Sequence, residues 1–167
     1  MAVTLHPLSA SDAPPARALA DAVLGDAPFA GSMLTALEHA LRSSSDEYRA
    51  IVARDVNAVI GVIVFGETAG ALGAGRIYFV AVASAERRRG IGTALVEAAC
   101  NAVRSSGGRF VMMELAEEPW TDAGRALARR TGFRREGGVP DYARDGVHLV
   151  LLRRDLDEAE NGGRFRA

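Results

Sequence analysis

The middle of the chain, residues 79–93, reads FVAVASAERRRGIGT. Residues 79–83 are the end of a mostly apolar run, Arg76 to Ala83, and this run predicts a buried central strand. From Gly90 to Val103 apolar residues recur at helical spacing, and Ser105 to Gly108 then favour the end of that helix. A basic, glycine-containing turn therefore joins a buried strand to the start of a long helix.

This turn has the chemistry of an anion site. Backbone N–H groups at a helix N-terminus lack intrahelical acceptors, and the helix dipole is positive there. A pyrophosphate would find these donors in place, and glycines would let it approach the backbone closely. Guanidinium groups add bidentate phosphate contacts. The candidate residues for a cofactor that carries a diphosphate and a nucleotide are Arg87, Arg88, Arg89, Gly90, Ile91, Gly92 and Thr93.

Further elements are expected on both sides of the turn. Two β-rich runs, Tyr48 to Arg54 and Ala58 to Phe65, have hairpin spacing and should pair antiparallel. Phe110 to Leu115 reads as a strand, which completes a right-handed strand, helix, strand crossover. The glycine-rich segment Gly66 to Gly75 is expected to be a loop.

The ends of the chain are expected to complete the sheet and its helices. The N-terminal part predicts a strand over Val3 to Leu8, a helix over Ala16 to Leu24 that Ser9 or Ser11 could cap, and a second helix around Met33 to Leu41. The C-terminal part predicts a helix from Thr121 or Asp122 to Gly132, followed by strands over Phe133 to Tyr142 and Val147 to Leu152.

The pattern resembles a known family. Arg87-x-x-Gly90-x-Gly92, after a strand that ends in Val-Ala-Val-Ala, is similar to the coenzyme A signature of the GCN5-related N-acetyltransferases. The resemblance extends from residue 3 to residue 155. It includes Phe29 to Tyr48 as the second-helix region, Val59 to Gly61 in the third strand, and Arg129 to Phe133 as the Gly-Phe motif.

The resemblance implies an α/β fold with a mixed, mostly antiparallel sheet of six or seven strands and helices on both faces. It implies acetyl-coenzyme A as cosubstrate, with no metal. The pantetheine arm would pair with the strand residues Val80, Ala81 and Val82, and the pyrophosphate would lie on Arg88 to Thr93. A splay between this strand and Phe110 to Leu115 would admit the thioester.

Two residues are the catalytic candidates, Glu114 as the base and Tyr142 as the acid. Glu114 matches a carboxylate that relatives use to deprotonate the amine, although a strand-end carboxylate paired with an Arg would look the same. Relatives often carry a Tyr as thiolate acid where this chain has Ala128, so Tyr142, after Pro140-Asp141, is the substitute candidate for the acid or for acceptor binding. A half-buried tyrosine that only packs in the last hairpin would look the same. Thr121 stands where relatives often have Asn, and it would either assist at the cofactor or cap a helix.

Length and composition bound these expectations. A chain of 167 residues fits one domain, expected over 1–156 with a frayed polar tail over 157–167. A net charge of −1 gives no general attraction to nucleic acid or anionic membrane, so neither is expected as a partner. One cysteine, Cys100, and three scattered histidines predict neither a disulfide nor a zinc site. The expected protein is cytoplasmic, as a monomer or homodimer.

Three functions stay open at this point. The first is N-acetylation of a small-molecule or peptide amine, a group that ranges from antibiotics to protein lysines. The second is a coenzyme A-binding sensor that has lost turnover, which the missing Tyr at Ala128 favours. The third is a dinucleotide-binding oxidoreductase, because Gly90-x-Gly92 opens a helix and Glu114 follows about 20 residues later. Leu95 in place of a third glycine speaks against the third.

Overall fold

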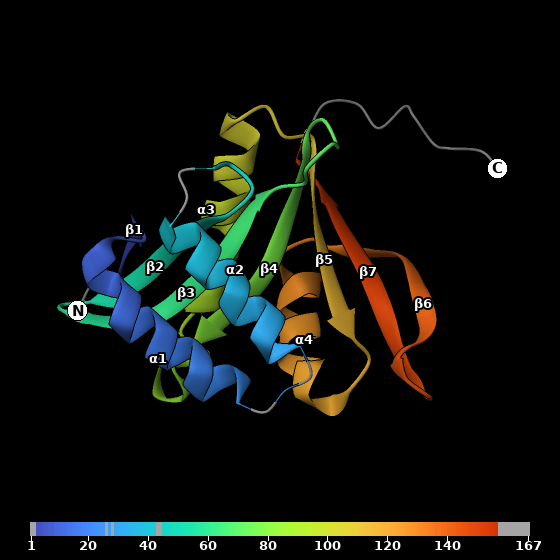
Figure 1. Ribbon diagram of the computed structural model, residues 1–167, viewed down its shortest axis with the longest axis horizontal. Helices are drawn as coiled ribbons and strands as arrows, with labels where there is room; N and C mark the ends of the chain where they lie inside the picture. Colours follow the sequence, from blue (N-terminus) through green and yellow to red (C-terminus); the bar gives the residue numbers. More distant parts are fainter. Residues whose placement is uncertain (1–2, 26, 28, 43–44, 157–167) are drawn as a thin grey trace.

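The architecture is one seven-stranded sheet with two helices on each face (Figure 1). It comes from a computed structural model, which describes residues 3–25, 27, 29–42 and 45–156. The spatial strand order is β1-β2-β3-β4-β5-β7-β6, and only β4 and β5 are parallel. The strands are β1 (Thr4–Pro7), β2 (Arg49–Asp55), β3 (Ala58–Glu67), β4 (Ala74–Val82), β5 (Phe110–Ala116), β6 (Arg134–Arg144) and β7 (Val147–Asp155). The predicted fold class is therefore confirmed.

The helices cover the sheet in pairs. Helices α1 (Ala13–Leu24) and α2 (Ala30–Arg42) lie on one face, and α3 (Ile91–Ser105) and α4 (Asp122–Arg130) lie on the other (Figure 1). Three short 3-10 turns, η1 (Ala10–Asp12), η2 (Ser84–Glu86) and η3 (Pro119–Thr121), precede α1, α3 and α4. None of the helices in the described part of the chain is long and apolar enough to cross a membrane.

Strands β4 and β5 pair over only part of their length. Their parallel pairing begins at Ala74 and Phe110 and ends at Ile77 and Met113, although both strands continue further. On its other edge β4 has a register shift, because Phe65 pairs with Ile77 and Val64 with Phe79. Tyr78 is the extra residue of this β-bulge. Bulges bend a strand and increase its twist, so β4 turns away from β5 where their pairing stops.

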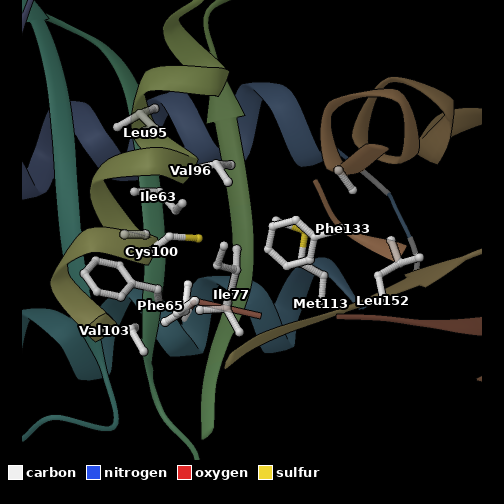
Figure 2. Close-up of a cluster of buried hydrophobic side chains, with 14 of the residues drawn as sticks. Ile63, Phe65, Ile77, Leu95, Val96, Cys100, Val103, Met113, Phe133 and Leu152 are labelled. Carbon is white, nitrogen blue, oxygen red and sulfur yellow. The ribbon is translucent and has the colours of Figure 1, made fainter. Parts of the chain in front are cut away.

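The apolar face of α3 anchors it to the sheet. Figure 2 shows its side chains Val96, Cys100 and Val103 packed with Ile63 and Phe65 of β3. Leu95 is also fully buried, and truncating such a leucine to alanine costs about 2–5 kcal/mol. This packing fixes the helix start, and with it the basic turn, at the end of β4.

Most predicted elements are confirmed, including both hairpins and the parallel β4-α3-β5 unit. The predicted loop Gly66 to Gly75 is too long, because Glu67 still pairs with Gly75 across β3 and β4. Thr121 precedes α4, but its side chain makes no capping hydrogen bond. The expected tail, residues 157–167, lies outside the described residues.

A buried carboxylate ties the start of α1 to the sheet. Asp12 Oδ2 accepts hydrogen bonds from the Ser9 N–H at 3.0 Å and the Ser9 hydroxyl at 2.6 Å, and its Oδ1 pairs with Arg54 of β2. Burial alone would raise the pKa of Asp12, but the Ser9 hydrogen bonds and the Arg54 charge together lower it below its ordinary value of 3.8. The ionised form is therefore the one that stabilises the fold.

Replacing this carboxylate should destabilise the protein. Asp12→Asn should lower the free energy of unfolding at neutral pH by about 1–3 kcal/mol, as measured by urea denaturation. Asp21→Asn is the control, because the Asp21 pair with Arg17 is exposed and should contribute less than about 1 kcal/mol. Since the folded-state pKa of Asp12 is lowered, its contribution is present above pH 3.8 and lost as the pH falls through that lower pKa. A gap between parent and Asp12→Asn that persisted unchanged in acid would contradict this account.

Candidate active site

The turn between β4 and α3 has the backbone of an anion site. Arg88 has φ 63° and Gly90 has φ 80°, so two left-handed residues alternate with extended or helical neighbours. Such alternation turns successive N–H groups to one side and forms a concave anion site. Gly90 is the N-cap of α3 and its carbonyl accepts the Ala94 N–H at 2.9 Å. The N–H groups of the first turn of α3 precede this bond and have no acceptor within the helix.

The three arginines of the turn differ in their partners. Arg89 pairs with Glu86 of η2, and Arg87 Nε donates to the Val82 carbonyl at 3.4 Å. Arg88 has no side-chain partner within the described ranges, and all three residues are exposed. The turn thus offers a free guanidinium beside free N–H groups, which fits a phosphate-bearing cofactor.

The strand that leads to this turn has a free edge. Gly61, Val62 and Ile63 of β3 pair with Val82, Ala81 and Val80 on one side of β4. On the other side β5 has already separated after Ile77. Backbone groups on that edge are available to an extended chain, as a pantetheine arm would require.

A cavity of about 220 Å³ opens where the two strands diverge. It contains both predicted catalytic residues, Glu114 from β5 and Tyr142 from β6. Its lining is Phe29, Ser32, Met33, Arg76, Ile77, Tyr78, Glu114, Leu115, Ala116, Trp120, Tyr142 and Leu149. Residues far apart in the sequence are therefore brought to one site.

Glu114 is paired inside this cavity. Its Oε2 accepts a hydrogen bond from Arg76 Nη2 at 2.6 Å, so the Arg partner considered from sequence is present. The Arg76 guanidinium also lies 5.5 Å from the Tyr78 ring centroid. Burial is the main cause that raises the pKa of Tyr78 to about 12, so this phenol stays protonated at neutral pH.

Tyr142 reaches the cavity because the last hairpin is bulged. Val139 pairs with Leu149 and Arg144 with Val147, which leaves four residues of β6 opposite the single residue His148. Asp141 within this bulge has φ 50°, and its N–H donates to His148 Nδ1 at 3.1 Å. Tyr142 then lies with its ring centroid 6.3 Å from that of Phe29, at the start of α2.

Thr121 and Ala128 lie away from the cavity lining. Thr121 is 3% exposed, and its hydroxyl donates to the carbonyls of Ala116 at 2.6 Å and Glu118 at 2.8 Å. These bonds stabilise the η3 turn, and the role of Thr121 at the cofactor stays a prediction. Ala128 is fully buried in the core cluster on the α3 face. No proton donor reaches the cavity from that position of α4.

Several lining residues were not singled out as site residues from sequence, among them Phe29, Arg76 and Trp120. Arg76 carried a weak signal, because it is a charged residue within an otherwise apolar strand. Trp120 is held by its neighbour, since its Nε1–H donates to Glu118 Oε2 at 2.9 Å while Glu118 pairs with Arg144 of β6. That network depends on long-range contacts, which the sequence does not reveal.

No group of three or more His, Cys, Asp or Glu residues that could hold a metal occurs in the described part of the chain. The dinucleotide-binding interpretation is wrong, because that fold needs a mostly parallel, doubly wound sheet. Here β4 and β5 form the one parallel pair of the described sheet. Gly90 and Gly92 therefore belong to a fold of a different class.

Comparison with known proteins agrees with the geometry. Residues 17–133, more than half of the chain, match the family described as Acetyltransferase (GNAT) family. The chain belongs to this family of acetyltransferases. No protein of curated function matches its sequence.

Solved structures share the fold at low sequence identity. A GNAT-family protein from Desulfovibrio desulfuricans is 23% identical with a TM-score of 0.85, over 93% of this chain and 100% of that one. The ribosomal-protein-S18-alanine N-acetyltransferase from Escherichia coli is 16% identical with a TM-score of 0.73, over 98% and 100%. A Salmonella typhimurium protein with its cofactor acetyl-CoA is 19% identical with a TM-score of 0.73, over 95% and 96%.

The lone cysteine should be inert in the native protein. Cys100 is fully buried, and burial is the main cause that raises the pKa of its thiol to about 11. We expect a disulfide reagent at mildly alkaline pH to leave the folded protein unlabelled and to label the unfolded protein at Cys100. Cys100→Ala, unreactive in both states, is the control. Rapid labelling of the native protein would contradict the burial.

Proposed function

We propose that the protein is an acetyl-coenzyme A-dependent N-acetyltransferase that acetylates a primary amine. One observation carries the proposal. The cavity with Glu114 and Tyr142 opens at the separation of β4 from β5. From there the free edge of β4 leads to the turn before α3, Arg87 to Thr93, which we call the anion-binding turn. A cosubstrate with a pyrophosphate at one end and a reactive group at the other fits this arrangement. The acetyl-CoA complex of the Salmonella protein supports the same choice.

The residues suggest a mechanism without a covalent enzyme intermediate. Bound acetyl-coenzyme A would supply an activated thioester as acyl donor. The amine nitrogen of the acceptor forms a bond to the thioester carbonyl carbon, and the carbon–sulfur bond breaks with its electron pair on sulfur. Glu114 takes the proton from the amine, and Tyr142 donates a proton to the departing sulfur. Holding both partners in the cavity supplies much of the rate.

The anion-binding turn is tested by Gly92→Glu. A Cβ at Gly92 meets Leu127 Cδ2 at 3.3 Å, a flexible methyl group that can yield, so the fold should persist. The new carboxylate would repel phosphates at the helix start. We expect binding of acetyl-coenzyme A, measured by calorimetry, to fall below detection.

Gly31→Glu is the matched control for this variant. Gly31 is also the second residue of its helix, α2, and a Cβ there meets nothing within 4 Å. It should bind acetyl-coenzyme A as the parent does, and the parent should bind NAD far more weakly. Tight binding by Gly92→Glu would show that the pyrophosphate lies elsewhere.

The catalytic assignment is tested by Glu114→Gln and Tyr142→Phe. With an accepted amine, Glu114→Gln should lower kcat/KM by about 10²-fold or more, the range typical of positioned bases. Tyr142→Phe should have a smaller effect, because a thiolate is a good leaving group. Glu117→Gln is the control, since Glu117 pairs with Arg135 outside the cavity lining. Unchanged turnover in both test variants would remove these residues from the mechanism.

Binding of acetyl-coenzyme A by the parent protein without acetylation of any amine would instead favour the coenzyme A-binding sensor.

A further inference from the structure

The cavity carries one cation and one anion side by side. Arg76 and Glu114 are the charged residues among its described lining, and they are 2.6 Å apart at Nη2 and Oε2. Their side chains are 37% and 31% exposed, so both remain accessible from the cavity. The other N–H groups of Arg76 have no acceptor within the described ranges. A ligand with adjacent positive and negative groups would complement this pair.

The Arg76 side chain is supported by a stack of aromatic rings. Its guanidinium lies over the Tyr78 ring, which stacks on Tyr48 with centroids 4.9 Å apart. Tyr48 stacks in turn on His39 of α2, also at 4.9 Å. A guanidinium supported by a stack of rings is pre-organised for a planar anion such as a carboxylate.

An apolar collar surrounds the same cavity. Phe29, Trp120 and Tyr142 are 42%, 41% and 55% exposed, and they make up half of the six exposed large hydrophobic residues in the described ranges. Exposed apolar groups gathered at one concave site mark a ligand-binding surface. The Glu118 carboxylate, which also pairs with Arg144, fixes the Trp120 ring through Nε1.

The cavity is small. Its volume of about 220 Å³ is below the roughly 300–1,000 Å³ of sites for drug-sized ligands. It therefore suits an acceptor the size of one amino acid.

We propose that the acceptor is a free α-amino acid with an apolar or aromatic side chain, an inference that rests on the proposed N-acetyl transfer. The α-carboxylate binds Arg76, the α-amine lies beside Glu114, and the side chain packs against the collar of Phe29, Trp120 and Tyr142. A peptide N-terminus lacks the α-carboxylate, and a simple cationic amine leaves Arg76 without a ligand. The products are the N-acetylamino acid and coenzyme A.

Trp120 is the one tryptophan of the chain, so its fluorescence reports acceptor binding independently of acetyl transfer. The parent would be titrated with L-phenylalanine, L-phenylalaninamide and 2-phenylethylamine, with and without coenzyme A. We expect phenylalanine to bind at least about 10-fold more tightly than the other two, because only it offers Arg76 a carboxylate, which can form a bidentate ion pair. L-Glutamate should bind weakly, since its side chain is charged.

Variants of Arg76 test whether this residue binds the α-carboxylate of the acceptor. Arg76→Gln should weaken phenylalanine binding by about 10- to 100-fold, and 2-phenylethylamine should bind unchanged or more tightly because Glu114 loses its partner. Arg76→Lys should retain part of the preference. Arg49→Gln is the control, because Arg49 also lies over an aromatic ring, that of Phe65 at 5.1 Å, outside this cavity. Circular dichroism would be used to check that each variant is folded.

The outcomes separate this inference from the proposed function. Equal binding of all three ligands, equal weakening of all three by Arg76→Gln, or no fluorescence change with any of them would overturn the amino-acid site. A thiol-release assay with acetyl-coenzyme A reads transfer separately. Acetylation of amines or dipeptides in preference to phenylalanine would overturn the inference and leave N-acetyl transfer standing. Arg76-dependent phenylalanine binding without thiol release would support the site and overturn the proposed transfer.

Discussion

The separation of β4 from β5 is the feature on which the rest of the site depends. A fully paired parallel sheet would bury both edges and leave no room between the strands. The bulge at Tyr78 bends β4 as its pairing with β5 stops, and α3 packs firmly enough on the sheet to keep the diverging strand in place. One local irregularity is thus associated with a free backbone edge, a cavity and the approach to the turn that we propose binds the pyrophosphate. The structure loses some hydrogen bonds there, which burial of the α3 face offsets.

Elements that depend on local sequence signals could be predicted, whereas features that depend on contacts between distant parts of the chain could not. The β4-turn-α3 unit could be predicted because a buried apolar run, glycines at a helix start and a 3.6-residue period are local signals. The extension of β3 to Glu67 could not, because pairing with Gly75 overrides the low strand propensity of glycine. Glu114 and Tyr142 became site candidates through family resemblance, whereas Arg76 and Trp120 become candidates only because the fold places them at the same cavity.

The ion pair of Arg76 and Glu114 sets the electrostatic character of the cavity. A lone carboxylate there would attract any cation and hold an ammonium group in its unreactive form. In the proposed site, a neighbouring guanidinium offsets that charge and offers its own donors, so the cavity would select ligands by the arrangement of their charges rather than by their net charge. The exposed collar adds the apolar contribution, and at about 25 cal/mol per Å² of buried apolar surface even one side chain is a substantial part of the affinity for a small acceptor.

Ala128 occupies the position where relatives often carry the acid, but the proposed transfer does not require a proton donor there. Ala128 is fully buried in the core cluster on the α3 face of the sheet. Tyr142 reaches the cavity from the bulged β6-β7 hairpin, which lies on the opposite side of β5 from β4. A free thiol has a pKa of about 8.5, far below that of an alcohol, so a departing thiolate needs little help from a proton donor. In the proposed transfer the amine is the more demanding partner, because it must lose a proton as it attacks. Under the proposed mechanism, selection for turnover would therefore act more strongly on Glu114 and its Arg76 partner than on the identity of the acid.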